Sequence, residues 1–172
     1  MIYIIGSLSN PRVEEVADRL RAEGFDAFDQ WRAAEGDFWA SYAQRRGMSF
    51  RDALAMDFTE TAFQFDLKYL NKAHTGVLVM PAGRSAGLEL GYLLGRGKRG
   101  YVLYDGEPER PDLMAKLATG VCFSVEELLD ALKPPTALVP EVSNSHPGLH
   151  PSFPRLGISC ACADCLRDRG DR

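Results

Sequence analysis

Short apolar runs are spaced along the first 133 residues of the chain. Three of them, IYIIG (2–6), GVLVM (76–80) and GYVLY (100–104), are rich in β-branched or aromatic residues and have the length of buried strands. FDAF (25–28) is a shorter candidate of the same kind. The runs are bounded by polar or glycine-containing segments, which is typical of strands that end in loops.

Helical patterns fill the intervals between these runs. Asn10 is placed to cap a helix that has Pro11 at its first position and ends near Gly24. Ser49 opens a longer helical pattern, and Asp66 is expected at the end of that helix, at the edge of its apolar stripe. The stripe consists of Phe58, Ala62, Phe65 and Tyr69.

Two more helices are predicted, over about 85–95 and over 124–133, where Ser124 and Glu127 form a capping box. Strands that alternate with helices predict a single-domain α/β layered fold of the Rossmann or flavodoxin-like class, with a mainly parallel sheet flanked by helices. We expect this domain to span residues 1–133. Residues 134–172 hold six of the ten prolines and no sustained periodicity, which predicts an irregular C-terminal tail.

Composition and charge exclude several classes of function. The chain has 172 residues, 45% of them hydrophobic, which fits one globular domain. A net charge of −4 gives no electrostatic basis for binding a nucleic-acid polymer. No apolar run reaches the roughly 18 residues of a membrane span, and the N-terminus starts with a strand pattern instead of a signal peptide. Cys122 stands apart from three clustered cysteines, so there is no disulfide framework and we expect a cytoplasmic protein.

The stretch VMPAGRSAGLELGYLLGRGK (79–98) places a carboxylate just after a strand. In parallel sheets ligands bind outside the carboxyl ends of the strands, where the loop GSLSN (6–10) is expected to meet this stretch. Glu89 lies in the first turns of the predicted helix, whose N-terminal partial charge favours an ionised carboxylate. Leu88 and Leu90 are expected to exclude water around it. Glu89 is therefore suited to nucleophilic attack or to stabilising a cation, unless it merely favours the helix start.

Two glycine-containing motifs surround Glu89. GRGKRG (95–100) matches a dinucleotide-binding pattern, but it follows a helix and precedes a strand, so we reject that function for it. Arg84 and Ser85, at the helix start, can hold a monophosphate together with backbone N–H groups, and Ser7 and Ser9 can assist. The alternative is an exposed arginine and a serine that caps the helix.

The segment GLELGYLLGRGK (87–98), with an acid 23 residues before Glu89 in FDLKYLNKAH (65–74), resembles the nucleoside 2-deoxyribosyltransferase family and the related nucleotide N-glycosidases. The similarity covers roughly residues 1–133. It implies an enzyme that cleaves or exchanges the N-glycosidic bond of a 2′-deoxynucleoside or its 5′-monophosphate through a covalent glycosyl intermediate. It also implies no cofactor and a homo-oligomer, a dimer or larger.

The resemblance assigns roles where residues match. Glu89 stands at the position of the nucleophile, Tyr3 at that of the tyrosine that orients it, and Asp66 at that of the acid near the nucleobase. Asp112 and Met114 stand where the transferases use an asparagine and a methionine of a neighbouring subunit to bind the sugar hydroxyl.

Two positions depart from the family pattern. His74 replaces an aspartate that often follows the Asp66 position, and Gly83 stands where the family has a base-recognising aspartate or a phosphate-binding serine. Base preference and transferase activity are therefore left open. The expected substrate-binding residues of the two loops are Gly6, Ser7, Ser9, Gly83, Arg84 and Ser85.

Several alternatives also stay open. Water or a second base can resolve a glycosyl ester, so the same residues serve a hydrolase or a transferase. An NAD-type N-glycosidase using the same glutamate and a non-catalytic nucleotide-binding sensor are the competing functions.

Aromatic and metal-binding side chains leave further alternatives. One set of aromatic residues can stack on a base or belong to the core: Trp31, Phe38, Trp39 and Tyr42. One set of tail residues can bind zinc, with redox-active or unpaired thiols as the alternative: Cys160, Cys162, Cys165 and His150, with His146 nearby.

Overall fold

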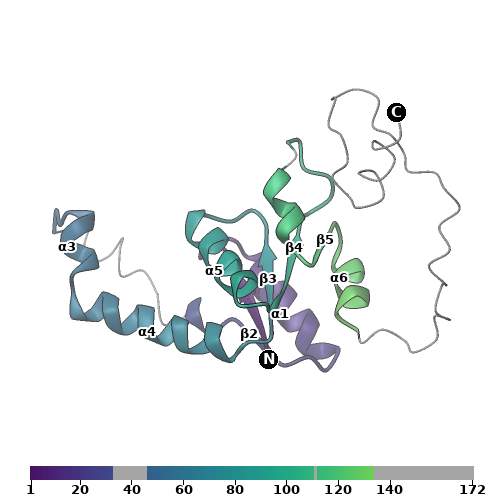
Figure 1. The fold of residues 1–172 in the computed structure, drawn as a ribbon, viewed down its shortest axis with the longest axis horizontal. Coiled ribbons are helices and arrows are strands. Elements are labelled where there is room, and N and C mark those ends of the chain that lie inside the picture. Colours follow the sequence, from purple (N-terminus) through teal and green to yellow (C-terminus); the bar gives the residue numbers. More distant parts are fainter. Residues whose placement is uncertain (33–45, 111, 134–172) are drawn as a thin grey trace, which may run out of the picture. The chain divides into compact units, whose positions relative to one another are not determined.

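A computed structural model describes residues 1–32, 46–110 and 112–133 (Figure 1). The chain divides into two units, Met1–Pro135 and Thr136–Arg172, and all the described residues lie in the first.

Five strands form one sheet in the order β2-β1-β3-β4-β5, and every neighbouring pair is parallel. This is the strand order of flavodoxin-like folds. The predicted α/β layered fold with a parallel sheet is therefore confirmed. The strands are β1 (Ile2–Ile5), β2 (Ala27–Phe28), β3 (Thr75–Val79), β4 (Arg99–Leu103) and β5 (Gly120–Cys122).

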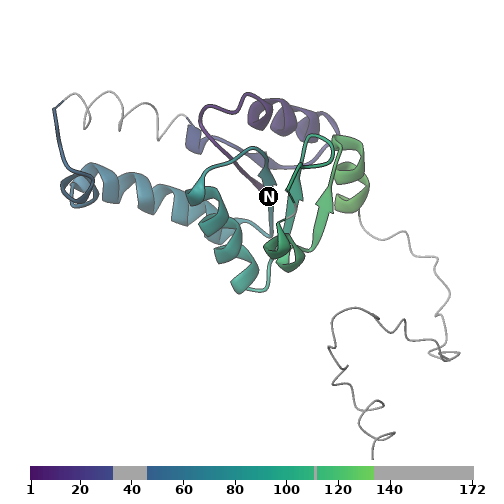
Figure 2. The same cartoon turned by 90° about the horizontal axis from the view of Figure 1, so that it is seen from above.

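Helices cover both faces of the sheet (Figure 2). On one face α1 (Arg12–Ala22) packs on β1, β2 and β3, and α6 (Val125–Leu132) packs on β4 and β5. On the other face α5 (Arg84–Gly95) packs on β1, β3 and β4, and α4 (Asp57–Lys72) lies beside α5. The central strands β1 and β3 are fully buried because helices cover them on both sides.

The helix ends follow the capping chemistry of the sequence. The side chain of Ser124 accepts a hydrogen bond from the amide of Glu127 at the start of α6, as the capping box predicts. Asn10 accepts from the amide of Arg12, and Pro11 already has helical backbone angles, so α1 begins within a residue of the predicted start.

The region after Ser49 differs from the prediction of one helix. Ser49 caps a short helix, α3 (Phe50–Leu54), and α4 starts separately at Asp57. Asp66 therefore lies in the middle of α4 and not at its end. Only the second half of the predicted stripe packs on the sheet, where Tyr69 stacks on Phe28 with ring centroids 4.0 Å apart.

Two elements at the other side of the sheet were not predicted. The edge strand β5 is only three residues long, and a short 3-10 helix, η2 (Leu113–Leu117), precedes and contacts it. The sequence GVC of β5 is too short to show a periodicity, so its pairing with β4 is a consequence of tertiary contacts.

Candidate active site

The loops that follow β1 and β3 meet at the point where the chain direction reverses. After β1 the chain continues into α1 on one face, and after β3 it continues into α5 on the other face. Such a switch point is where parallel α/β sheets bind ligands. A cavity of about 370 Å³ opens there, lined by Ser7, Ser9, Asn10, Pro11, Pro81, Ala82 and Gly83.

The polar groups of this switch-point cavity include two serine hydroxyls, which stand among the apolar side chains of its lining. Ser7 Oγ and Ser9 Oγ are 2.9 Å apart, and the Ser9 amide donates to Ser7 Oγ at 3.3 Å. On the opposite wall the Met80–Pro81 bond is cis, and a Cβ added to Gly83 would have nothing within 4 Å. The cavity therefore offers hydrogen-bonding hydroxyls on one side and approachable backbone on the other.

The predicted loop residues separate into two groups. Ser7, Ser9 and Gly83 line the cavity, whereas Arg84 and Ser85 are exposed in the first turn of α5 and are not in its described lining. Gly83 is the cap residue of α5, so Ser85 does not cap the helix. Gly6 has a structural reason to be glycine, because a Cβ there would overlap the side chain of Val13 in α1.

Glu89 lies in the second turn of α5 and is half-buried. Tyr92, three residues later on the same side of the helix, donates from its hydroxyl to Asn71 of α4 at 2.7 Å, so this side of α5 faces α4. Leu90 is buried against the sheet, but Leu88 is 77% exposed. The expectation that Leu88 excludes water around Glu89 is therefore wrong, because residue 88 points away from the sheet.

Tyr3 lies on the same face of the sheet as α4 and α5. It is 1% exposed, and its register partner Gly76 faces the side chain of Leu93 in α5. The Tyr3 ring lies 5.5 Å from that of Phe28, which in turn stacks on Tyr69 of α4.

Asp66 is on α4, one turn before Tyr69. It is half-buried, and its Oδ1 is shielded from solvent. Tyr3, Asp66 and Glu89 thus come from β1, α4 and α5, which pack together on one face of the sheet. None of the three is in the described lining of the switch-point cavity.

His74 lies at the opposite edge of the sheet, just before the amino end of β3. Its Nε2 is 2.7 Å from the amino group of Met1. Burial lowers the pKa of His74 below its usual value, and the positive charges of that amino group, Arg99 and Lys98 lower it further. His74 is therefore distant from the cavity.

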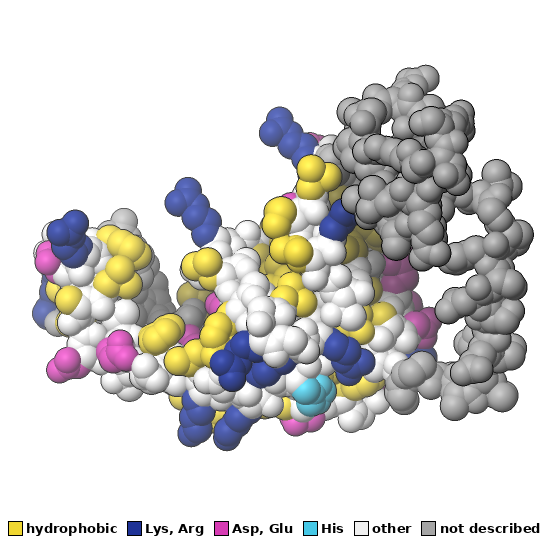
Figure 3. All heavy atoms as spheres, in the orientation of Figure 1, with side chains coloured by type: hydrophobic (Ala, Val, Ile, Leu, Met, Phe, Trp, Pro, Cys, Tyr) yellow, Lys and Arg dark blue, Asp and Glu magenta, His cyan; other side chains and the backbone are white. Residues whose placement is uncertain are grey.

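Met114 belongs to η2, and Asp112 immediately precedes it. The Asp112 carboxylate accepts a hydrogen bond from the Met114 amide at 2.9 Å and so caps this short helix. Met114 is 65% exposed, and Leu113 and Leu117 of the same short helix are exposed as well. Hydrophobic side chains are visible at the surface on the face shown in Figure 3.

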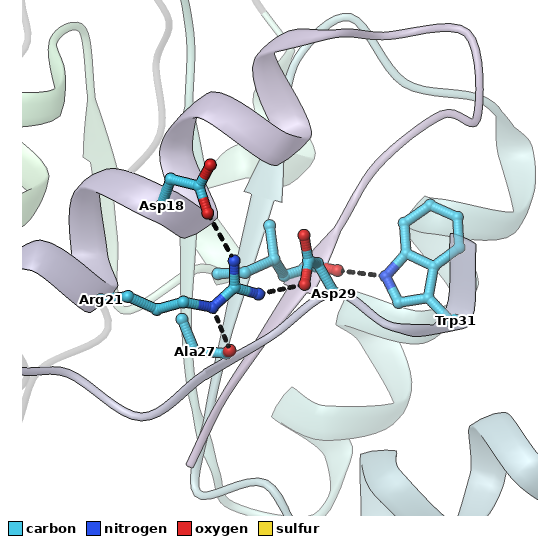
Figure 4. A network of polar contacts seen from close by, with 6 residues as sticks. Asp18, Arg21, Ala27, Asp29 and Trp31 are labelled. Atoms are coloured by element: carbon cyan, nitrogen blue, oxygen red, sulfur yellow. Dashed lines mark hydrogen bonds and ion pairs between the residues drawn. The ribbon is translucent and has the colours of Figure 1, made fainter. Parts of the chain in front are cut away.

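Trp31 belongs to the core and does not cover a ligand. Its ring is buried, and Nε1 donates to the Ile4 carbonyl at 2.7 Å. Figure 4 shows this hydrogen bond. It also shows Arg21, which forms ion pairs with Asp18 and Asp29. The other aromatic candidates, Phe38, Trp39 and Tyr42, lie outside the described residues.

The zinc candidates Cys160, Cys162, Cys165 and His150, together with His146, also lie outside the described residues. In the part that the structure describes, no group of three or more His, Cys, Asp or Glu side chains is arranged to hold a metal ion. None of the helices within 1–32, 46–110 and 112–133 combines the length and apolar character needed to cross a bilayer.

Sequence reasoning missed the side chains that hold the cavity together. The sequence predicts Asn10 as a helix cap, but its amide also donates to the carbonyls of Val79, the last residue of β3, and of Pro81 in the following loop. A second cavity, of about 430 Å³, is lined by Leu8 of the same loop and by Glu14, Asp29, Gln30 and Arg32. The helix-capping pattern was the available signal for Asn10, and it gives no information on the partner loop.

Comparison of the chain with protein-family models and with curated proteins finds no match. The residues of the site and the chemistry that they support therefore form the basis of the proposed function.

Proposed function

We propose that this protein cleaves or exchanges the N-glycosidic bond of a 2′-deoxynucleoside or its 5′-monophosphate, with Glu89 as the nucleophile. The observation that supports this most directly is the origin of three residues on one face of the sheet. Tyr3, Asp66 and Glu89 are far apart in sequence, yet β1, α4 and α5 pack together there. Glu89 also lies only six residues after Gly83, which belongs to the switch-point loop.

The proposed reaction has two displacement steps. A Glu89 carboxylate oxygen attacks C1′ of the sugar, the C1′–N bond breaks, and its electron pair leaves with the base. Asp66 supplies the proton that the leaving nitrogen takes up. Water, or a second base, then attacks C1′ and releases the Glu89 carboxylate, and its proton returns to Asp66. Tyr3 orients the nucleophile in this proposal.

The switch-point cavity is the proposed binding site for the 5′ end of the substrate. The hydroxyls of Ser7 and Ser9 can donate hydrogen bonds to a 5′-hydroxyl or a 5′-phosphate. The N-terminus of α5 adds a partial positive charge beside Gly83, which favours an anionic group.

Assembly into a homo-oligomer in the cytoplasm is part of the same proposal. The exposed apolar side chains of η2, including Met114, support contact with a second copy. We expect sedimentation equilibrium to give a mass of at least two chains. A monomeric mass would remove Asp112 and Met114 from any shared site.

The test is a product assay with deoxynucleosides, their 5′-monophosphates and NAD, with and without an acceptor base. Glu89→Gln removes the nucleophile at nearly constant shape, and we expect turnover to fall by at least about 10³-fold. Glu126→Gln is the matched control, because Glu126 is an exposed glutamate of α6 on the other face of the sheet.

The outcomes separate the competing functions. Full turnover by a folded Glu89→Gln variant refutes the assigned nucleophile. Release of nicotinamide from NAD, with no base released from deoxynucleosides, favours the NAD-type glycosidase. Tight binding of a monophosphate without any product after many hours favours a nucleotide sensor.

A further inference from the structure

Three polar side chains link the loops at the carboxyl edge of the sheet. Arg32, after β2, donates from Nη1 to the carbonyls of Ser7 and Asn10 in the loop after β1, at 3.3 and 3.2 Å. Asn10 donates from Nδ2 to the carbonyl of Val79, which ends β3, and to that of Pro81 in the following loop, at 3.4 and 3.0 Å.

Arg12 continues this series to the next strand. Its Nη1 donates to the Met80 carbonyl at 3.3 Å, and its Nη2 lies 3.3 Å from Oδ1 of Asp105 after β4. Arg32, Asn10 and Arg12, which we call the edge belt, therefore join the loops of β2, β1, β3 and β4 in the same order as the strands in the sheet.

Asn10 is the central member of the edge belt and the most buried, at 6% exposure. Its Oδ1 accepts from the Arg12 amide at 3.1 Å while its Nδ2 donates to the two carbonyls of the β3 loop. Both ends of the side-chain amide are therefore engaged, and a buried amide with this set of partners has one preferred orientation.

We propose that Asn10 is a positioning residue of the candidate active site. Its amide holds the loop that carries Ser7 and Ser9 against the loop that ends at Gly83, and so sets the width of the switch-point cavity between them. This inference rests on the proposed function for its kinetic consequence, but the link between the two loops can be measured without a substrate.

The kinetic consequence follows from the location of the chemistry. When the link is lost, only a fraction of the molecules has the two walls at the binding distance, and the apparent affinity falls by that fraction. Glu89, Tyr3 and Asp66 lie on α5, β1 and α4 and not on the edge belt. We therefore expect a higher KM with little change in kcat.

Asn10→Asp separates the two roles of this residue. Aspartate keeps an oxygen for the Arg12 amide, so the helix cap is retained. It has no donor for the carbonyls of Val79 and Pro81, and the link is lost. Ser124→Ala is the matched control, because it removes a capping hydrogen bond at the start of α6 on a helix that the edge belt does not touch.

The first measurement is amide hydrogen exchange at Met80, whose N–H donates to the Leu103 carbonyl directly beside the link. We expect exchange at Met80 to become about tenfold faster in Asn10→Asp, as an opening made about 1.4 kcal/mol easier would give. Exchange at the Arg12 amide should stay slow. Ser124→Ala should leave Met80 unchanged.

The second measurement is steady-state kinetics with a deoxynucleoside, which carries no phosphate for the new carboxylate to repel. We expect KM to rise about tenfold in Asn10→Asp, with kcat within about twofold of the unmodified protein, and no such split in Ser124→Ala. If Asn10→Asp does not fold, Asn10→Ser replaces it, since serine keeps a capping oxygen but is too short to reach Pro81.

The two measurements distinguish failure of this inference from failure of the proposed function. Unchanged exchange at Met80 overturns the inference, whether or not the protein is an enzyme. Faster exchange with an unchanged KM shows that the link does not position substrate, and it overturns the inference as well. Absence of base release from the unmodified protein refutes the proposed function, and exchange at Met80 then decides alone whether Asn10 couples the loops.

Discussion

Adding one methyl group at Gly76 tests the packing that supports Glu89. Gly76 lies in β3, and a Cβ built there would be 2.5 Å from Cδ1 of Leu93 and 3.2 Å from Cδ1 of Ile5. Both neighbours are fully buried. Gly76→Ala therefore forces a methyl group into the layer between the sheet and α5, the helix that carries Glu89.

The expected cost follows from the overlap. Carbon atoms pack at about 3.5–4.0 Å, so the Leu93 side chain, or α5 with it, must move by roughly 1 Å. Overpacking of this kind costs about 1–3 kcal/mol. Alanine has fewer conformations than glycine in the unfolded chain, and this difference offsets about 0.4–1 kcal/mol of that cost. We expect the free energy of unfolding of Gly76→Ala to fall by about 1–2 kcal/mol.

Urea denaturation followed by circular dichroism measures this change. With a slope of about 1–3 kcal/mol per molar urea, the midpoint should fall by roughly 1 M, at constant slope. Gly87→Ala is the matched control, because Gly87 is exposed on α5 and a Cβ there meets nothing within 4 Å. That variant should gain up to about 1 kcal/mol from helix propensity. Equal stability of Gly76→Ala and the unmodified protein would show that α5 does not pack on β3 as described.

Two further changes test contacts at other places in the domain. Trp31→Phe removes the hydrogen bond to the buried Ile4 carbonyl, and we expect a loss of about 1–2 kcal/mol, measured by thermal denaturation. An unchanged melting temperature would contradict it. The lowered pKa of His74 means that the unfolded chain takes up the proton first as the pH falls, so the native state loses stability below the usual value of 6.5. As the pH falls from about 7.5 to 5, the urea midpoint should decrease less in His74→Gln than in the unmodified protein. An equal decrease in both proteins would show that His74 is not the source of the pH dependence.

Local patterns predicted most of the fold because the signals of the central elements are strong. The apolar run of β1 and the capping box at Ser124 specify their elements within a few residues. The short elements escaped prediction. β5 has three residues and no period of its own, and the apolar stripe begins only at Phe58, so it gives no sign of the break between α3 and α4 that precedes it.

The candidate site was predictable to the level of loops but not of contacts. The rule for parallel sheets brings the loop of Ser7 and Ser9 to Gly83, and these residues do line one cavity. The direction of Leu88 depends on which face of α5 meets the sheet. The bond from Asn10 to Pro81 joins residues 71 positions apart, and such a contact arises only from the assembled fold.

The two edges of the sheet consist of its shortest strands, β2 with two residues and β5 with three. An exposed strand edge can pair with another chain through its row of unpaired backbone N–H and C=O groups. Edge strands of two or three residues offer few such groups for pairing. Fibril-like growth by sheet extension is therefore disfavoured for the folded domain. Any stable self-association should instead bury side chains, and it should respond to substitutions of exposed apolar residues and not to proline placed in the edge strands.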